Sequence, residues 1–143
     1  MNQLFALPYN MLIANVDDDV DDREFFSDAL RSVDPQIPCV LFENGSELLD
    51  YLENSKSLPD YIFLDINMPK MNGYECAQEI KSNYHSEEIQ IVMYSTAFNP
   101  LDLQKFARDG FKYIVKQNTL TDLVQSIRNV ISPVVIIQPV GKP

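Results

Sequence analysis

The sequence predicts an α/β fold in which helices cover both faces of a parallel β-sheet. Short, continuous apolar runs alternate with segments of helical periodicity, which gives five strand–helix units along the 143 residues. Continuous apolar runs are typical of strands buried on both faces. The regular order of the units favours parallel strands joined by right-handed crossover connections.

Five apolar runs mark the predicted strands. They are residues 11–16 (MLIANV), 39–42 (CVLF), 61–64 (YIFL), 89–95 (IQIVMYS) and 112–115 (KYIV). Because each run is continuous, we expect every strand to be buried on both of its faces.

Capping signals and apolar faces mark the helices between these strands. Capping pairs precede three of them: Asn44 with Glu47, Asn72 with Glu75, and Thr119 with Asp122. Another helix begins at Asn99-Pro100 and ends at Gly110. The apolar residues expected to face inward are Phe25, Phe26, Ala29, Leu30, Val33, Leu48, Leu49, Leu52, Cys76, Ala77, Ile80, Leu103, Phe106, Ala107, Leu123, Val124, Ile127, Val130 and Ile131.

Composition and charge restrict the classes of function. Hydrophobic residues make up 45% of the chain and the formal net charge is −10, so the chain is globular and strongly acidic. An acidic surface repels phosphate backbones and anionic membranes, so we expect no binding to nucleic acid or membranes. The sequence has neither a transmembrane run nor a signal peptide, which predicts a cytoplasmic location.

The predicted units fill residues 11–131, where we expect one domain, with 1–10 as an N-terminal extension. Residues 132–143 form a tail that is too short for a second domain. The tail contains a β-branched apolar segment, 134–137 (VVII), which would be prone to aggregation if it were free. We therefore expect 134–137 to pack on its own domain or on a partner subunit.

Polar residues follow the predicted strands, at the edge where open α/β sheets bind ligands. They are Asp17 and Asp18 after the first strand, Asp65 after the third, Ser95 and Thr96 after the fourth, and Lys116 after the fifth. Crowded carboxylates repel each other unless a divalent cation such as Mg²⁺ binds them. A lysine and a hydroxyl suit a phosphoryl group, so the pattern predicts a phosphoryl site with Asp65 as the nucleophile.

Four motifs in fixed order carry a resemblance to a known family. They are NVDDD (15–19), IFLDINMPKMNG (62–73), MYSTA (93–97) and YIVK (113–116). Over residues 11–131 the chain resembles the CheY-like receiver domain of two-component response regulators. The resemblance implies a flavodoxin-like (βα)5 fold, a doubly wound sheet with strand order 2-1-3-4-5.

The resemblance assigns the phosphoacceptor and the metal ligands. Asp65 is the residue that is phosphorylated. Asp17, Asp18, Asp65 and the backbone carbonyl of Asn67 would hold Mg²⁺ or Mn²⁺.

The resemblance also assigns a phosphate-binding set and a switch. Ser95, Thr96 and Lys116 would bind the phosphoryl group, and Ser95 with Tyr113 would form the switch. Ser95 and Thr96 compete for one role, and we favour Ser95 because successive strand residues face opposite sides. Gln117 stands where the family usually has a proline, so we expect the Lys116–Gln117 peptide bond to be trans.

The partners implied by the resemblance are proteins. A sensor histidine kinase or a histidine phosphotransfer protein would supply the phosphoryl group. Without an output domain, a downstream protein target would receive the signal, and residues 99–131 could support a weak homodimer. We expect a signalling switch that slowly dephosphorylates itself, not a turnover enzyme.

Two alternatives remain open. An aspartyl-phosphate phosphohydrolase also uses a strand-end aspartate, but it typically has a second acid two residues later, where this chain has Asn67. A receiver-like interaction module would not be phosphorylated at all. For the nearby acids Asp19, Asp21 and Asp22 we expect only a role at the N-terminus of the first helix.

Overall fold

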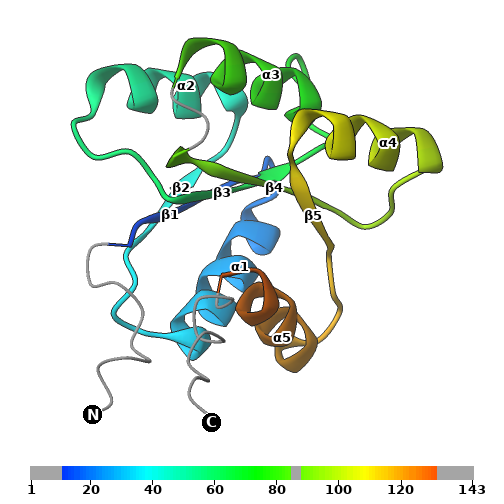
Figure 1. The fold of residues 1–143 in the computed structure, drawn as a ribbon. Coiled ribbons are helices and arrows are strands. Elements are labelled where there is room, and N and C mark those ends of the chain that lie inside the picture. The colour runs from blue at the N-terminus through cyan, green and yellow to red at the C-terminus, as the bar shows by residue number, and fades with distance from the viewer. Residues whose placement is uncertain (1–10, 85–87, 132–143) are drawn as a thin grey trace, which may run out of the picture.

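Five parallel strands form one sheet in the computed structural model, which describes residues 11–84 and 88–131. The strands are β1 (Ile13–Val16), β2 (Cys39–Phe42), β3 (Tyr61–Asp65), β4 (Gln90–Ser95) and β5 (Lys112–Val115). They lie in the order β2-β1-β3-β4-β5, which confirms the predicted fold class (Figure 1). The tail segment 134–137 lies outside the described residues.

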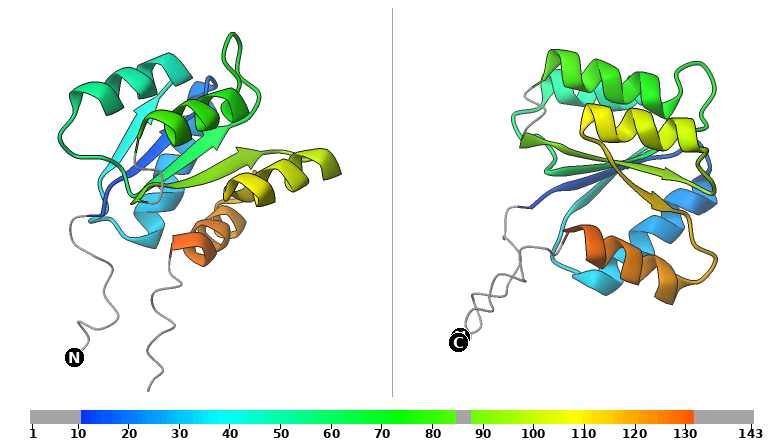
Figure 2. Two further views of the ribbon diagram at one scale, coloured as in Figure 1. Left: turned by 45° about the horizontal axis from the view of Figure 1, so that its top comes forward. Right: turned by 45° about the vertical axis from the view of Figure 1, so that its right-hand side comes forward.

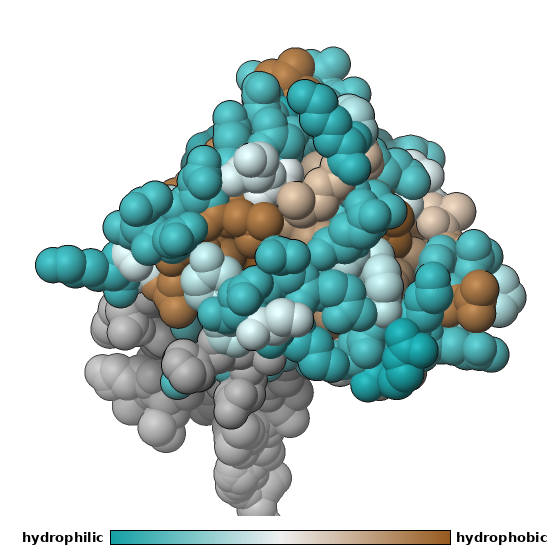
Figure 3. Space-filling view, turned by 90° about the horizontal axis from the view of Figure 1, so that it is seen from above, coloured by the Kyte–Doolittle hydropathy of each residue, from teal (hydrophilic) through white to brown (hydrophobic). Residues whose placement is uncertain are grey.

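Helices cover both faces of the sheet, as Figures 1 and 2 show. One face carries α1 (Val20–Val33) and α5 (Leu120–Ile131), and the other carries α2 (Gly45–Asn54), α3 (Gly73–Asn83) and α4 (Pro100–Asp109). Each side has its own hydrophobic core, around Phe26 and Phe63 beside α1, and around Leu64 and Met93 on the opposite side. Figure 3, which looks onto the side of α2, α3 and α4, shows a mostly hydrophilic surface with small hydrophobic areas. No helix in the described ranges could cross a membrane.

The predicted caps start the helices, with one difference. Asn72 accepts from the Glu75 amide at 2.8 Å, and Glu75 accepts from the Asn72 amide at 3.0 Å, a complete capping box. Asn44 caps α2 in the same way, but the Glu47 side chain accepts from the amide of Glu43. The Glu47 side chain thus reaches one residue beyond the N-cap and pairs with the backbone amide of Glu43. Helix α2 still begins directly after Asn44, as the sequence predicts.

Burial of all five strands on both faces was a wrong prediction for the sheet edges. Leu41 of β2 and both Tyr113 and Val115 of β5 are exposed. β2 and β5 are edge strands, where the covering helices do not extend over every side chain. Ala107 was also predicted to face inward and is exposed. Helix α4 buries Phe106 against the sheet, and Ala107, the next residue, faces solvent.

The loop from β3 to α3 brings the helix against the end of the strand. The amide of Gly73 donates to the Ile66 carbonyl at 2.9 Å. Lys70, within this loop, has a φ of 69°, which is the left-handed conformation that non-glycine residues adopt only at a cost. The loop therefore contains local strain a few residues from Asp65.

Lys70→Gly is expected to raise the free energy of unfolding by about 1 kcal/mol, because glycine adopts positive φ without a Cβ clash. Urea unfolding of the metal-free protein measures the change. Lys70→Ala is the matched control, since it removes the same charge but keeps the strain. Equal stabilities of the glycine and alanine variants would contradict the assignment of strain to this residue.

Candidate functional site

The two central carboxylates come from neighbouring strands at the carboxyl edge of the sheet. Asp65 is the last residue of β3, and Asp17 directly follows β1. The register of the parallel strands pairs Val16 with Leu64. The residues that follow this pair, Asp17 and Asp65, therefore lie side by side. The chain runs from β1 outward to β2 and then returns to β3 on the other side of β1, so these strands flank the topological switch point. Ligands of doubly wound sheets bind at this place.

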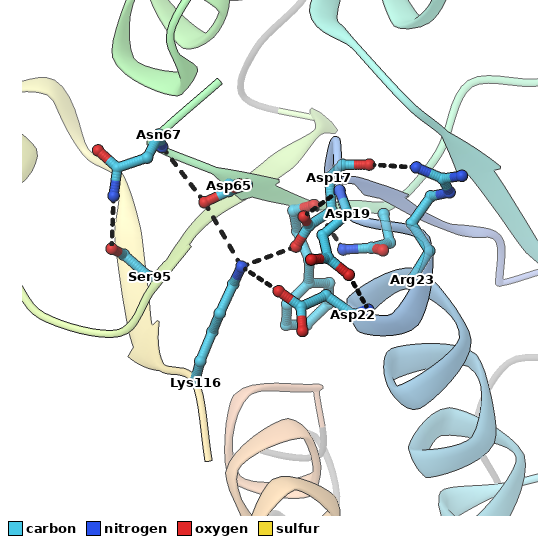
Figure 4. A network of polar contacts seen from close by, with 10 residues as sticks. Asp17, Asp19, Asp22, Arg23, Asp65, Asn67, Ser95 and Lys116 are labelled. Carbon is cyan, nitrogen blue, oxygen red and sulfur yellow. Dashed lines mark hydrogen bonds and ion pairs between the residues drawn. The ribbon is translucent and has the colours of Figure 1, made fainter. Parts of the chain in front are cut away.

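Lys116 provides the positive charge of the site, as Figure 4 shows. Its Nζ lies 2.8 Å from Asp17 Oδ2, 3.0 Å from Asp22 Oδ2 and 3.6 Å from Asp65 Oδ1. The backbone amide of Lys116 donates to the Ser95 carbonyl at 2.8 Å, which anchors the residue beyond the end of β5. Its ammonium also lies 5.2 Å from the centre of the Tyr94 ring, a cation–π distance.

Burial and crowding change the protonation of these groups. Burial, and then the charge of Asp17, raise the pKa of Asp65 from 3.8 to about 7, although Lys116 acts in the opposite direction. Burial also raises the pKa of Asp17, partly offset by its hydrogen bond from Lys116. For Lys116, burial alone would lower the pKa, but the hydrogen bonds to Asp17 and Asp22 raise it above its usual value. Without further positive charge, Asp65 therefore holds a proton part of the time near neutral pH.

Three carboxylates of the site can hold a metal ion. Asp17, Asp18 and Asp65 each offer an oxygen, and these oxygens lie within 4.8 Å of one another. Oxygen ligands of Mg²⁺ lie at about 2.1 Å, so two ligands on opposite sides of the ion are about 4.2 Å apart. The observed spacing fits such an ion after a shift of under about 1 Å. The site thus has the donor type and nearly the spacing that a hard divalent cation needs.

Asp18→Ala is expected to weaken Mg²⁺ binding by roughly tenfold, equivalent to ~1.4 kcal/mol, because one of the three carboxylates is lost. The same change should stabilise the metal-free protein by about 0.5 kcal/mol, since it relieves like-charge repulsion. Isothermal titration and urea unfolding in EDTA measure the two effects. Asp21→Ala is the control, because Asp21 lies outside the carboxylate cluster. Lower stability of Asp18→Ala without metal would count against this account.

The hydroxyl of Ser95 lies beside the loop that follows Asp65. Ser95 is buried, and its Oγ accepts from the side-chain amide of Asn67 at 3.5 Å. The backbone amide of Asn67 donates to Asp65 Oδ1 at 3.2 Å, so Asn67 forms hydrogen bonds with both Asp65 and Ser95. Thr96 is exposed, and within the described residues its side chain forms no hydrogen bond with the site. The structure therefore brings Ser95, rather than Thr96, toward Asp65.

Tyr113 lies farther along the same side of the sheet. In the β4–β5 register, Met93 pairs with Tyr113 and Ser95 with Val115, so Tyr113 and Ser95 face the α4 side. Tyr113 is 46% exposed, and its ring contacts the ring of Phe98, with 5.3 Å between the ring centres. A buried hydroxyl and a half-exposed ring on the same face of the sheet are two features that a switch between these residues requires.

Two contacts of the site were not predicted from the sequence. Asp22 was assigned only to the first turn of α1, where Asp19 is in fact the N-cap, but it also pairs with Lys116. Arg23 donates to the Asp17 carbonyl at 2.6 Å and so ties α1 to the end of β1. The sequence feature that could have indicated a role for Arg23 is its position directly after the acidic segment 17–22. The Lys116–Gln117 bond is trans, as predicted, since the described residues contain no cis peptide bond.

Comparison with known proteins agrees with this geometry. The response regulator receiver domain family matches residues 13–128. LytT, a sensory transduction protein of Oceanobacillus iheyensis, is 33% identical over 94 residues, which cover 66% of this chain and 37% of LytT. The chain thus spans well under half the length of that curated relative.

Solved structures show the same architecture. The phosphorylated cyanobacterial phytochrome response regulator RcpA is 30% identical, with a TM-score of 0.74, and the match covers 84% of this chain and 90% of RcpA. The chemotaxis protein CheY4 of Vibrio cholerae shares the fold with a TM-score of 0.72 at 23% identity, covering 87% of this chain and 99% of CheY4. The family match extends over most of the sequence and includes every element of the sheet. The chain therefore belongs to the receiver domain family of two-component response regulators.

Proposed function

We propose that this receiver domain, residues 11–131, accepts a phosphoryl group on Asp65 and signals through protein contacts. The donor is a phosphohistidine of a sensor histidine kinase or of a histidine phosphotransfer protein. One observation carries the proposal. At the switch point, a lysine and two further carboxylates surround an aspartate that is only 4% exposed. RcpA, at 30% identity, is a response regulator in its phosphorylated form, which supports the same chemistry here.

The chemistry is an in-line displacement at phosphorus. A carboxylate oxygen of Asp65 forms the new P–O bond while the P–N bond to the donor imidazole breaks. The released ring nitrogen keeps the bonding electron pair and takes up a proton. The Lys116 ammonium, 3.6 Å from Asp65 Oδ1, is close enough to offset charge on the transferred group after a small movement. Hydrolysis of the acyl phosphate restores the aspartate and resets the switch.

The remaining residues of the site have supporting roles. Mg²⁺ or Mn²⁺, held by Asp17, Asp18, Asp65 and the backbone carbonyl of Asn67, would supply positive charge to the phosphoryl oxygens. Positive charge near Asp65 favours its ionised form, and the ionised form is the nucleophile. Ser95 would donate its hydroxyl proton to a phosphoryl oxygen.

Incubation with acetyl phosphate and Mg²⁺ tests the proposed function. The intact protein is expected to gain the mass of one phosphoryl group, and EDTA is expected to prevent the gain. Absence of the modification at saturating acetyl phosphate and Mg²⁺ would favour the alternative of a receiver-like module that is not phosphorylated.

A phosphohydrolase is the other alternative, and Asn67 argues against it. Its side chain is an amide rather than a carboxyl group, so it cannot supply the second acid that phosphohydrolases place two residues after the nucleophile. Steady turnover of p-nitrophenyl phosphate, in place of a single modification, would support the phosphohydrolase. We expect no turnover beyond slow self-dephosphorylation.

Phosphorylation is expected to change amide hydrogen exchange over residues 97–131. Ser95 would move toward the phosphoryl group, and the half-exposed Tyr113 ring would move inward to the space left beside it. At the far end of α4, Asp109 accepts from the Tyr74 hydroxyl at 2.5 Å and from the Gln78 amide at 2.9 Å, both on α3. The change should therefore be larger at the amino end of α4 than at its carboxyl end.

Exchange measured with and without beryllium fluoride, a phosphoryl mimic, checks this expectation. The carboxyl end of helix α2 serves as the internal control, because α2 lies at the opposite side of the sheet from α4 (Figure 1) and only its residues up to Asp50 line the cavity beside Asp18. Unchanged exchange across 97–131 on binding of the mimic would contradict the switch.

The surface formed by α4, β5 and α5 is the proposed contact site for a downstream protein or a second copy of the chain. Its exposed apolar residues are Leu101, Tyr113, Val115 and Leu120. They lie on the elements that the switch would move, so phosphorylation could change their packing. The net charge of −10 favours a basic protein surface as the partner over nucleic acid.

A further inference from the structure

Asp22 of α1 is bound to the lysine of the site. Its Oδ2 accepts from Lys116 Nζ at 3.0 Å, although the two residues are 94 positions apart in the sequence. Asp22 is not needed as the helix cap, because Asp19 caps α1 by accepting from the Asp22 amide at 3.0 Å. The Asp22 carboxylate is thus free to extend from the first turn of α1 toward Lys116 (Figure 4).

The three distances around Lys116 rank its partners. Asp17 at 2.8 Å and Asp22 at 3.0 Å are within hydrogen-bond range, whereas Asp65 at 3.6 Å is outside it. Asp17 is also one of the carboxylates that can hold a metal ion, whereas Asp22 is not among them. If Asp17 were bound to a metal ion, Asp22 would remain as the carboxylate within hydrogen-bond range of the ammonium.

Building on the proposed function, we infer that Asp22 is a positioning residue that competes with the phosphoryl group on Asp65 for Lys116. The unphosphorylated protein keeps Lys116 paired with Asp22 at the rim of the site. The ammonium has three protons to donate, but to contact a phosphoryl group it must move toward Asp65, which lengthens its 3.0 Å hydrogen bond to Asp22. Asp22 therefore weakens the phosphorylated form relative to a chain without a carboxylate at this position.

The direct test is the affinity for beryllium fluoride at saturating Mg²⁺. Asp22→Asn is expected to bind the mimic about fivefold more tightly than the wild type, because a part-buried ion pair that opposes binding is lost. Asp22→Glu restores the charge and is expected to return the affinity toward the wild-type value. A role of Asp22 in the stability of the fold alone would not produce this rescue.

Asp21→Asn is the matched control for net charge. Asp21 lies on the same helical turn and carries the same charge, but it is not an ion-pair partner of Lys116. Its substitution is expected to change the affinity by less than about twofold, the effect of one distant exposed charge. An equal gain in Asp21→Asn and Asp22→Asn would overturn the inference, and so would an unchanged or weaker affinity of Asp22→Asn.

A second measurement separates this inference from the proposed function. A double-mutant cycle with Asp22→Asn and Lys116→Met, followed by urea unfolding without metal, measures the coupling between the two side chains. Favourable coupling is expected, and zero coupling would overturn the inference whatever the protein binds. If the wild type binds no beryllium fluoride, the proposed function fails, and the competition for Lys116 fails with it.

Discussion

Asp65→Asn is expected to stabilise the metal-free protein by about 2 kcal/mol at pH 8, although it removes the proposed phosphoacceptor. The wild-type carboxylate is buried beside Asp17, and these surroundings raise its pKa to about 7. An amide has nearly the same shape and carries no charge, so it avoids the cost of ionisation in this place. The loss of the ion pair with Lys116, at 3.6 Å, reduces the gain.

The same substitution should flatten the dependence of stability on pH. The pKa of Asp65 is raised from 3.8 to about 7, so between these values the folded protein holds a proton that the unfolded chain has released. In that window stability falls as pH rises, and the contribution of protonated Asp65 is lost as pH passes through about 7. Asp65→Asn removes this contribution.

Urea unfolding in EDTA at pH 5 and pH 8 measures both effects. Asp50→Asn is the control, because Asp50 is an exposed carboxylate on α2. We expect the difference between the two pH values to shrink in Asp65→Asn and to stay at the wild-type value in Asp50→Asn. A loss of stability in Asp65→Asn at pH 8 would show that the ion pair with Lys116 outweighs burial.

Gly73→Ala is expected to destabilise the protein by about 2 to 3 kcal/mol, which is the range for overpacked positions. A Cβ on Gly73 would lie 2.3 Å from the carbonyl oxygen of Asp65 and 2.8 Å from Cα of Ile66. Both are backbone atoms, so either α3 or the end of β3 must shift. Because Asp65 itself is displaced, phosphorylation by acetyl phosphate should also slow.

Gly45→Ala is the matched control, since it places a Cβ at the start of a different helix. There the nearest atoms are the side-chain sulfurs of Cys76 and Met71, both at 3.1 Å, and Met71 lies on a loop where it can move. We expect a smaller loss of stability and unchanged phosphorylation. Equal effects of the two substitutions, measured by urea unfolding and intact mass, would contradict the close contact between α3 and Asp65.

Local signals in the sequence predicted the elements and their order, because each helix start is decided within a few residues. Asn72 and Glu75 cap α3 as expected, and Asn99-Pro100 starts α4. The exposure of β2 and β5 was missed because the apolar runs do not distinguish a central strand from an edge strand. Edge position depends on the strand order, which is a property of the whole sheet.

The site was predictable where it depends on strand ends and less so where it depends on a helix. The proximity of Asp17, Asp65 and Lys116 could be predicted, because all three stand at the ends of parallel strands that meet at one edge of the sheet. The pairing of Asp22 with Lys116 was missed because a first-turn acid already has a local explanation, the helix N-terminus. Only the packing of α1 against the sheet shows that this carboxylate also reaches the site.

Chemical mapping of the modified residue tests the central claim most directly. Borohydride reduces an acyl phosphate of aspartate to homoserine, so peptide mass spectrometry after treatment with acetyl phosphate and Mg²⁺ identifies the residue that was modified. We expect homoserine at position 65 in the wild type and no modification in Asp65→Asn. Homoserine at another aspartate in the wild type, or a phosphoryl group retained by Asp65→Asn, would contradict it.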